Sequence, residues 1–355
     1  MVYDVIIIWW GASGLFCSIC LPKQIKTCII EKTDSLGNKV LLSWWERCNL
    51  TNIHLDPELH YVWESLKSLP SLFHKFWSED MIAYLQEHKI DTKIEANGRV
   101  MLKSGKAKQL VEFLVHESTS NYTDHILSHE VLSISKAEDA TFIITTSSGV
   151  YKAKQVIVAT WWMTYPQIGA SPFAYDIAQQ LWLSLSSPHA ALCGIETKDD
   201  FSSLSGNTVQ ASLTLFKDNK KVYTSKWSLL FTHRWLSGPV IFDTTLYIAG
   251  DVSQYTLQCD FDFAGTSKKV VQYFELTTDD TVRDIPLTAL RSIQEAKVSV
   301  GWILLQELDQ SFQSKKISWL YFIGESVDIT GKTWWYNLQR AWTSAYVCAN
   351  SIQNL

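Results

Sequence analysis

The sequence predicts an α/β protein in which a mainly β domain is inserted into a discontinuous domain built on a parallel sheet. Three observations predict this fold. Residues 3–8 (Tyr-Asp-Val-Ile-Ile-Ile) contain a β-branched run that is typical of a central parallel strand. A helix expected from about Ala12 to Leu21 and a strand at Lys26–Ile30 complete a βαβ unit of about 30 residues. From about 190 to 300 the sequence changes to short strands and turns rich in Ser, Thr and Asp.

The remaining elements follow the same division. We expect the discontinuous domain at 1–189 plus 301–355, with a helical excursion at about 55–118, and the inserted domain at 190–300. The spacing of apolar residues predicts helices at 61–90, 106–118, 172–182 and 336–352. Alternating residues predict strands within 126–160, and a last buried strand is expected at 320–324.

Composition and charge exclude several classes of protein. The chain has 355 residues, of which 46% are hydrophobic, and it can therefore bury the cores of two domains. A net charge of −5 and the lack of a Lys/Arg cluster argue against a nucleic-acid partner, so a small-molecule substrate is expected. Cys and His never cluster at the spacing of metal ligands, so no metal site is expected.

The seven cysteines are scattered, which suits free thiols in a reducing cytoplasm. Cys17 and Cys20 form a C-x-x-C, the spacing of redox dithiols, but their apolar helical context favours buried packing cysteines. The segment Val5–Leu21 is uncharged and approaches the length of a membrane span. Its glycines and serines and the lack of a preceding basic region favour strand, turn and buried helix instead of a span or a signal peptide.

Tryptophan is the anomaly of this composition, with 16 residues against 15 glycines. Four Trp-Trp doublets stand where a chain must turn tightly or lie against a ligand, which are the positions where glycine is normally required. Each doublet follows a buried strand or precedes a polar loop or helix. The doublets are Trp9-Trp10, Trp44-Trp45, Trp161-Trp162 and Trp334-Trp335.

The segment Trp9–Gly14 lies between a strand and a helix and is a G-x-G-x-x-G motif without its first glycine. In this motif the second glycine admits a pyrophosphate and the third lets helix and strand pack closely. The phosphate lies at the helix N-terminus, where free N–H groups favour an anion. Glu31, at the end of the second strand, is placed to accept hydrogen bonds from a ribose.

Several further segments identify a family. The chain resembles the BaiN-like (YhiN, aminoacetone-oxidase-type) FAD-binding oxidoreductases over essentially its whole length. The most specific matches are Arg-Cys-Asn-x-Thr-Asn at 47–52 and Thr-His-x-x-x-Ser-Gly-Pro at 232–239. Further matching stretches are 4–16, 39–46, 158–169 and 324–344.

This resemblance implies FAD bound to a discontinuous Rossmann-like domain, an inserted domain that covers the flavin, and hydride transfer through it. NAD(P)H is a candidate electron donor, and the resemblance does not identify the organic substrate. No catalytic residue is assigned, since His233 is as well explained by an ordinary hydrogen-bonded histidine as by an acid or base. The implied cofactor-binding residues are Gly11, Ala12, Ser13, Gly14, Glu31, Lys32, Arg47, Cys48, Asn49, Val131, Thr160, Gly324, Glu325, Asp328, Asn337 and Leu338.

The departures from the family are of one kind, because tryptophan stands in place of glycine. By the family pattern this holds at the four doublets and at 235, and also at 182, 227, 302 and 319, whereas Trp63, Trp77 and Trp342 look native. Trp182 is expected at the C′ position of a helix, where a left-handed glycine is usual. We expect FAD binding and activity to be strongly impaired or lost, because bulky indoles at the doublets would obstruct the site.

Two other functions compete with this one. Paired indoles could form aromatic platforms for sugars or other flat ligands in a protein without flavin. They could also lie at a lipid interface, although the chain lacks basic flanks and further apolar spans. The flavin scaffold is favoured over the aromatic platform and the lipid interface, because the doublets follow buried strands and stand position by position where the family has glycine.

Overall fold

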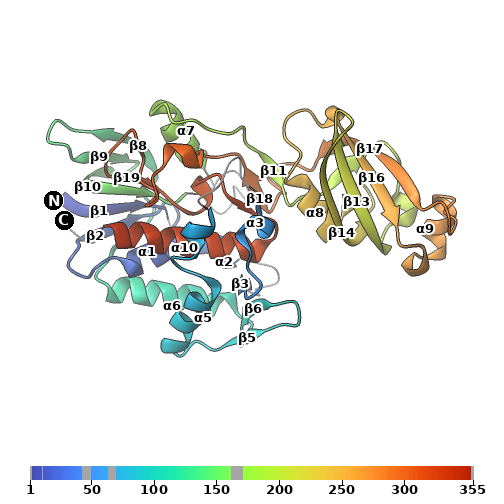
Figure 1. The fold of residues 1–355 in the computed structure, drawn as a ribbon. Coiled ribbons are helices and arrows are strands. Elements are labelled where there is room, and N and C mark those ends of the chain that lie inside the picture. Colours follow the sequence, from blue (N-terminus) through green and yellow to red (C-terminus); the bar gives the residue numbers. More distant parts are fainter. Residues whose placement is uncertain (1, 10, 42–48, 63–68, 161–170, 353–355) are drawn as a thin grey trace. The chain divides into compact units, whose positions relative to one another are not determined.

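The computed structural model describes residues 2–9, 11–41, 49–62, 69–160 and 171–352. The chain forms two compact units. The first, here called the sheet unit, comprises Met1–Ser186 and Gly301–Leu355, and the second, the barrel unit, comprises Ser187–Val300. Figure 1 shows the ribbon of both.

A seven-stranded sheet forms the centre of the sheet unit, in the order β7-β2-β1-β10-β9-β8, with β19 paired to β10 (Figure 1). The pairs of β1 with β2 and β10, of β2 with β7, and of β10 with β19 are parallel. The two pairs that involve β9 are antiparallel. The strands are β1 (Val2–Ile8), β2 (Thr27–Ile30), β7 (Asp124–Ile126), β8 (Val131–Lys136), β9 (Phe142–Thr146), β10 (Gly149–Val158) and β19 (Leu320–Phe322).

The registers bring the ends of the parallel strands to one edge. Ile8 pairs with Ile30 on one side and with Val158 on the other, and Val158 pairs with Phe322. Because parallel strands end at the same edge of a sheet, the segments that follow them converge there. This edge therefore gathers chain segments that are more than 300 residues apart in the sequence.

Helices and two small sheets complete the sheet unit. Helix α10 contacts α1 and β3, and α1 also contacts α6. The small sheets are β3-β6-β5 and β20-β4. The helices are α1 (Ala12–Cys20), α2 (Asn38–Leu41), α3 (Pro57–His60), α4 (Leu69–Phe73), α5 (Ser78–Glu87), α6 (Ala107–Ser120), α7 (Phe173–Gln180) and α10 (Trp334–Ser351), and the small strands are β3 (Asn49–Asn52), β4 (Tyr61–Val62), β5 (Thr92–Ile94), β6 (Arg99–Leu102) and β20 (Thr330–Gly331).

The region 55–118 differs from the helical excursion that the spacing of apolar residues predicts. Strands β5 and β6 lie within it, and the helix expected at 61–90 begins instead with strand β4. Val62 of β4 pairs with Thr330 of β20, a partner 268 positions later in the chain. A pairing over such a distance overrides local propensity, and no local pattern can reveal it.

The barrel unit is a closed barrel in the order β12-β15-β14-β13-β16-β17. Its core follows strict alternation, since Val209, Ala211, Leu213 and Leu215 of β13 are buried and their neighbours are not. The predicted fold class, a Rossmann-like sheet domain with an inserted mainly β domain, is therefore confirmed. The elements are β11 (His189–Ala191), β12 (Ile195–Thr197), β13 (Thr208–Lys217), β14 (Lys220–Phe231), β15 (Leu236–Ser237), α8 (Pro239–Thr245), β16 (Tyr255–Phe261), α9 (Lys268–Tyr273), β17 (Val282–Leu290) and β18 (Val298–Val300).

Candidate cofactor site

The turn from β1 to α1 is the centre of the candidate site. Trp9 lies in this turn with φ 78°, and its side chain is only 5% exposed. Its backbone N–H donates to the carbonyl of Ile30 over 2.9 Å, which ties the turn to the end of β2. Gly11 then caps α1 in an extended conformation, and Ala12 begins the helix. The sequence thus places a helix N-terminus directly behind the turn, as the phosphate-binding motif requires.

Two glycines hold the surrounding backbone in close contact. A Cβ on Gly14 would lie 2.4 Å from the carbonyl oxygen of Trp9, so helix α1 packs against the turn only because residue 14 has no side chain. Gly324 has φ 66°, and a Cβ there would lie 2.4 Å from Oγ of Ser13. The short helix at Gly324–Ser326 therefore lies directly against the N-terminus of α1.

Glu31 follows β2 at the same edge, but its carboxylate is directed to its own loop. Oε1 accepts hydrogen bonds from the backbone N–H and the hydroxyl of Thr33, over 2.7 and 2.8 Å. The residue is only 2% exposed. The Oε1 atom of Glu31 thus binds the loop that follows β2, and the expected contact of Glu31 with a ribose stays a prediction.

The two other expected residues on this side are placed differently. Lys32 forms an ion pair with Glu130 over 2.7 Å, with both side chains partly exposed. The backbone of Glu31 is hydrogen-bonded to Ile126 and to His129, and Val131 begins β8 shortly after. Strand β8 thus starts beside the loop of Glu31. The ammonium of Lys32 pairs with the carboxylate of Glu130, the residue directly before β8.

Buried charges cluster next to Gly324. Lys39 forms an ion pair with Glu325, and both side chains are about nine-tenths buried. Asp328 accepts a hydrogen bond from Oγ of Ser186 over 2.8 Å. Arg340, 3% exposed, donates from Nη1 to the carbonyl of Ile329. The structure brings together Ser13, Gly324, Glu325 and Asp328, which the family resemblance names as cofactor-binding residues.

Burial lowers the pKa of both cations in this cluster. For Lys39 the loss of solvent lowers the pKa of the ammonium, and Glu325 opposes this effect. For Arg340 burial is again the largest cause of the lowered pKa, opposed by Glu325, Tyr61 and Asp328. Sequence reasoning missed Arg340 as a site residue. The sequence did single out Arg340, because it is the one charged residue of the segment 334–351.

The start of helix α10 is tied to the loop that precedes it. The side-chain amide of Asn337 donates to the carbonyls of Gly331 and Thr333, and its oxygen accepts from the N–H of Gly331. Asn337 therefore fixes the loop before the helix, and Leu338 is packed into the core. Trp335 is half-buried, and the guanidinium of Arg99 lies 5.5 Å from its ring centroid.

Several buried polar atoms around this edge have no hydrogen-bond partner within the described part of the chain. Buried polar groups are nearly always paired, so a bound ligand or water would complete the hydrogen bonding of such atoms. These atoms belong to segments that the family resemblance places at the cofactor or to the start of α10. They are Oδ1 of Asn49, Oγ1 of Thr160, Oγ1 of Thr330, Oγ1 of Thr333, Nε1 of Trp335 and Nε of Arg340.

Other predicted positions lie outside the described residues. They are Trp10, Trp44, Trp45, Arg47, Cys48, Trp161 and Trp162, and the side chain of Trp334. Cys17 and Cys20 are free thiols, and Cys17 is fully buried in helix α1. Burial raises the pKa of both thiols well above the usual value, which is the behaviour of packing cysteines and the opposite of a reactive dithiol.

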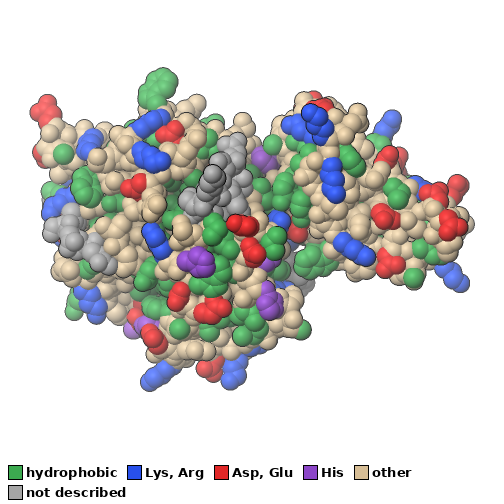
Figure 2. Space-filling view, viewed as in Figure 1, with side chains coloured by type: hydrophobic (Ala, Val, Ile, Leu, Met, Phe, Trp, Pro, Cys, Tyr) green, Lys and Arg blue, Asp and Glu red, His purple; other side chains and the backbone are tan. Residues whose placement is uncertain are grey.

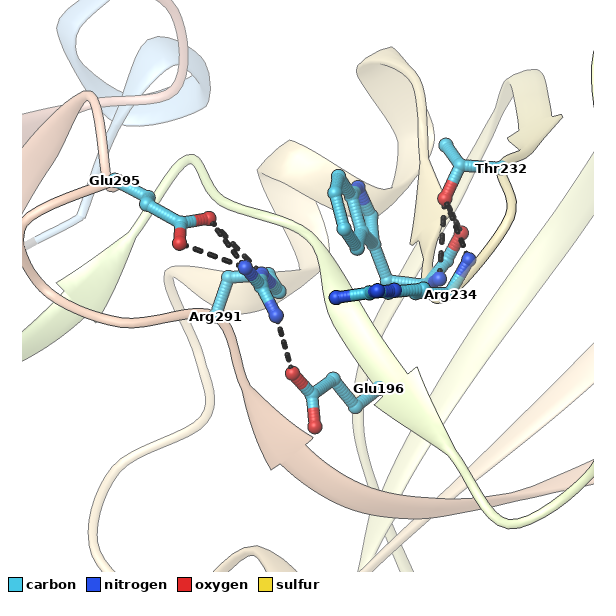
Figure 3. A network of polar contacts seen from close by, with 6 residues as sticks. Glu196, Thr232, Arg234, Arg291 and Glu295 are labelled. Atoms are coloured by element: carbon cyan, nitrogen blue, oxygen red, sulfur yellow. Dashed lines mark hydrogen bonds and ion pairs between the residues drawn. The ribbon is translucent and has the colours of Figure 1, made fainter.

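The second specific motif, Thr232–Pro239, lies in the barrel unit. The hydroxyl of Thr232 accepts from the N–H groups of Arg234 and Trp235 and donates to the carbonyl of Trp235. Figure 3 shows this turn beside Arg291, which bridges Glu196 and Glu295. The Arg291 guanidinium also lies 4.3 Å from the centroid of the Trp235 ring. His233 is exposed at the tip of the turn.

The comparisons with known proteins agree with this geometry. Residues 3–351 match the model of the HI0933-like protein Rossmann domain. The chain belongs to this family. The family that the motifs at 47–52 and 232–239 predict is thereby confirmed.

Curated relatives match over nearly their whole length. Two proteins named ribosomal RNA dihydrouridine synthase, from Haemophilus influenzae and Escherichia coli, are each 28% identical, with 98% or more of this chain and 98% of theirs covered. The 3-dehydro-bile acid delta(4,6)-reductase of Clostridium scindens is 19% identical, over 97% of this chain and 98% of its own.

Solved structures share the fold. A 3-ketosteroid-delta4-(5alpha)-dehydrogenase from Rhodococcus jostii matches with a TM-score of 0.60 at 12% identity, over 100% of this chain and 97% of its own. An open flavocytochrome c3 fumarate reductase matches with a TM-score of 0.53 at 12% identity, over 99% of this chain and 79% of its own. In the part of the chain that the structure describes, every helix is too short or too polar to cross a membrane.

Proposed function

We propose that this chain has the scaffold of an FAD-dependent oxidoreductase, and that its tryptophans prevent FAD from binding tightly. The observation that carries the proposal is the position of Trp9. The backbone of Trp9, with φ 78°, forms the turn between β1 and the N-terminus of α1, where the pyrophosphate of a dinucleotide would approach, and its indole is buried. A phosphate bound at this turn would have to be accommodated beside that indole.

The rest of the site fits a dinucleotide. Gly14 and Gly324 keep the backbone around the helix N-terminus free of side chains. The unpartnered oxygens of Asn49 and Thr160 and the unpartnered Nε of Arg340 supply polar contacts that a ligand could complete. The N–H groups of Ala12 and Ser13, at the start of α1, would hold the pyrophosphate, and Glu325 or Asp328 would accept from the ribityl chain.

When bound, FAD would carry a hydride from the electron donor to the substrate, as cofactors carry the chemistry in such enzymes. The chain's own residues would orient the ring and set its surroundings. Helix α10 begins at Trp334, and the positive end of the helix would stabilise negative charge on a reduced ring bound in front of it. The buried Lys39–Glu325 pair and Arg340 fix the charge balance beneath it.

The names of the relatives suggest the class of substrate. Forming a dihydrouridine and reducing a delta(4,6) dehydro-bile acid both reduce a carbon–carbon double bond conjugated to a carbonyl, which takes up one hydride and one proton. We infer the same reaction class here, with NAD(P)H as the electron donor. Two of the three relatives act on ribosomal RNA by name, so a uracil ring in RNA is the first candidate. A 3-keto steroid is the second.

An RNA substrate differs from the expectation, based on the net charge of −5, that the protein has no nucleic-acid partner. Figure 2 shows charged side chains of both signs scattered over the visible face, without a continuous basic stripe on it. An enzyme that recognises a single exposed base can depend on its pocket more than on phosphate contacts. For the competing aromatic platform, a ring must be exposed, whereas Trp9 is packed within the main hydrophobic core.

FAD titration tests the cofactor proposal. We would compare the chain with a variant that carries glycine at 9, 10, 161, 162, 334 and 335, and measure bound flavin by absorbance after gel filtration. We expect near-stoichiometric flavin in the variant and little in the original chain. The double variant W182G/W319G is the control, because these exposed tryptophans lie outside the expected site. Stoichiometric flavin in the original chain, or none in the glycine variant, would overturn the proposal.

A second assay tests the substrate. The flavin-loaded variant would receive NADPH with either an unmodified ribosomal RNA transcript or a 3-keto-4,6-diene steroid. Gain of two hydrogens, measured by mass spectrometry of the nucleosides or of the steroid, identifies the substrate class. Oxidation of NADPH with neither product formed would contradict the reaction class.

A further inference from the structure

Positive φ angles single out tryptophan in this chain. Among the described residues, twelve that are not glycine have φ in the left-handed region. Nine of them are nine different residue types, once each, and the other three are Trp9, Trp182 and Trp319. Bulky residues rarely adopt this conformation, because Cβ approaches the following carbonyl. A residue type that ought to be rare in this region is therefore the one that recurs.

Trp182 occupies a helix end that is built for glycine. Helix α7 ends at Gln180, and Trp182 follows at the C′ position with φ 55°. Its N–H donates to Gln179, and the N–H of Leu183 donates to Ala178, over 3.0 and 2.9 Å. These two bonds define the Schellman motif, in which the left-handed C′ residue is usually glycine. The indole is 85% exposed and packs against little that could offset the strain.

Trp319 is held in the same way in another exposed turn. Its φ is 72° and its side chain is 45% exposed. The backbone is fixed on both sides, because its N–H donates to Oε1 of Gln313 and its carbonyl accepts from Val156, over 3.0 and 2.9 Å. The turn cannot relax to a negative φ without breaking the start of β19 away from β10.

Two of the described tryptophans have the ordinary backbone conformation and side-chain contacts of this residue type. Trp342 is completely buried within α10, and its Nε1 donates to the carbonyl of Leu50 over 3.0 Å. Trp77 precedes α5 with φ −94° and stacks on His74. Trp227 and Trp302, in contrast, stand at expected glycine positions with ordinary φ, so backbone conformation neither requires glycine nor excludes it there.

We propose that the functional protein has glycine at positions 9, 182 and 319, and that the cell which makes this protein inserts glycine there during translation. Tryptophan selected to close a cofactor site would be confined to that site, yet Trp182 and Trp319 lie in exposed turns. A difference in decoding accounts for both locations. The codon UGA is read as tryptophan in some bacteria and as glycine in others, whereas UGG always specifies tryptophan. On this basis Trp77 and Trp342 are encoded by UGG, and the three left-handed positions by UGA.

The inference rests on the proposed function only at position 9, since positions 182 and 319 stand on backbone geometry alone. Its consequence for position 9 is that the cellular protein has an open phosphate-binding turn. The Trp9 N–H bond to Ile30 is made by the backbone, so glycine retains it. The phosphate-binding turn would then be open in the cell, and an indole would stand at position 9 only in the tryptophan form.

Peptide mass spectrometry of the protein isolated from its own cells tests the proposal. We expect the peptides that contain positions 9, 182 and 319 to be lighter by the difference between a tryptophan and a glycine residue. The peptides that contain Trp77 and Trp342 should keep tryptophan, and they serve as the internal control. The codons read from the gene give a second measurement: UGA is expected at 9, 182 and 319, and UGG at 77 and 342.

Tryptophan at 182 and 319 in the cellular peptides would overturn the inference, as would UGG codons at those positions. The outcome is independent of flavin. A cellular protein with glycine at these three positions and at the doublets that still takes up no FAD would refute the proposed cofactor and leave this inference standing. Flavin bound by the tryptophan form would refute the obstruction and not the decoding.

Discussion

The carbonyl oxygen of Trp9 lies 2.4 Å from the position that a Cβ on Gly14 would occupy. Strand β1 and helix α1 can therefore meet only while residue 14 is glycine, even though the other end of the same turn carries the largest side chain. This contact shows that the turn still has the close packing of a dinucleotide-binding motif.

Gly14→Ala should destabilise the sheet unit by about 1–3 kcal/mol, because the neighbouring atom is backbone and cannot rotate away. Urea unfolding measures the effect. Gly149→Ala is the matched control, since the nearest neighbours of a Cβ there are side-chain atoms of Tyr151 at 3.9 Å, and its effect should stay within about 0.5 kcal/mol. Equal effects of the two substitutions would contradict the close packing at Gly14.

Trp182→Gly should stabilise the protein by about 1 kcal/mol, because it removes the left-handed strain while an 85% exposed indole contributes little burial. Trp182→Ala retains Cβ and should give no comparable gain. The urea midpoints of the two variants provide the comparison. If alanine stabilises as much as glycine, strain at φ 55° is not the cause.

Trp342→Phe should cost about 1–3 kcal/mol, since the carbonyl of Leu50 would lose its buried donor. Trp227→Phe, at a side chain that is 43% exposed, should change the free energy of unfolding by less than about 0.5 kcal/mol. Thermal unfolding of both variants measures the difference. A neutral Trp342→Phe would mean that its hydrogen bond contributes nothing.

Arg291→Lys should destabilise the barrel unit by about 1–2 kcal/mol. The guanidinium binds Glu295 through two nitrogens, reaches Glu196 and stacks on Trp235, and an ammonium cannot do all three (Figure 3). The exposed pair of Lys108 with Glu112 is the control, and Lys108→Ala should cost less than about 0.5 kcal/mol. Hydrogen exchange of the barrel strands reports the local effect, and unchanged protection in Arg291→Lys would contradict it.

The lowered pKa of Lys297 predicts that the free energy of unfolding increases with pH. Burial lowers its pKa from 10.5 to about 8, and its ammonium lies 4.0 Å from the ring centroid of Phe242. Between these two values the unfolded chain binds more protons than the folded chain, so the free energy of unfolding should increase as pH rises. The gain should be on the order of 1–3 kcal/mol and level off above the unfolded pKa.

Urea unfolding at a series of pH values between 7 and 10.5, compared with Lys297→Met, isolates this effect from other titrating groups, with 10.5 being the ordinary pKa. Parallel curves for the two proteins would show that Lys297 titrates normally in the folded state.

Local patterns predicted the elements that depend on local forces. The strand predicted from the apolar run before Trp9 is β1, and the helix predicted after it is α1. The inserted domain predicted from the change in composition at about 190 corresponds to the barrel unit. The expectation that Trp182 stands at a left-handed C′ position was also correct, because helix ends follow from nearby residues. In region 55–118 the expected helices are partly confirmed by α4, α5 and α6, whereas strand β4 was missed because it forms by pairing with the distant β20.

The amino-acid sequence alone determined the family and the fold class, and it predicts the positions at which tryptophan replaces glycine, since motifs and spacing are properties of neighbours in the chain. Only the tertiary structure decided that Glu31 turns to Thr33, that Arg340 is buried beside Glu325 and Asp328, and that Trp9, Trp182 and Trp319 have positive φ. Those outcomes depend on which distant segments pack together, and packing across the fold sets burial, charge partners and backbone strain.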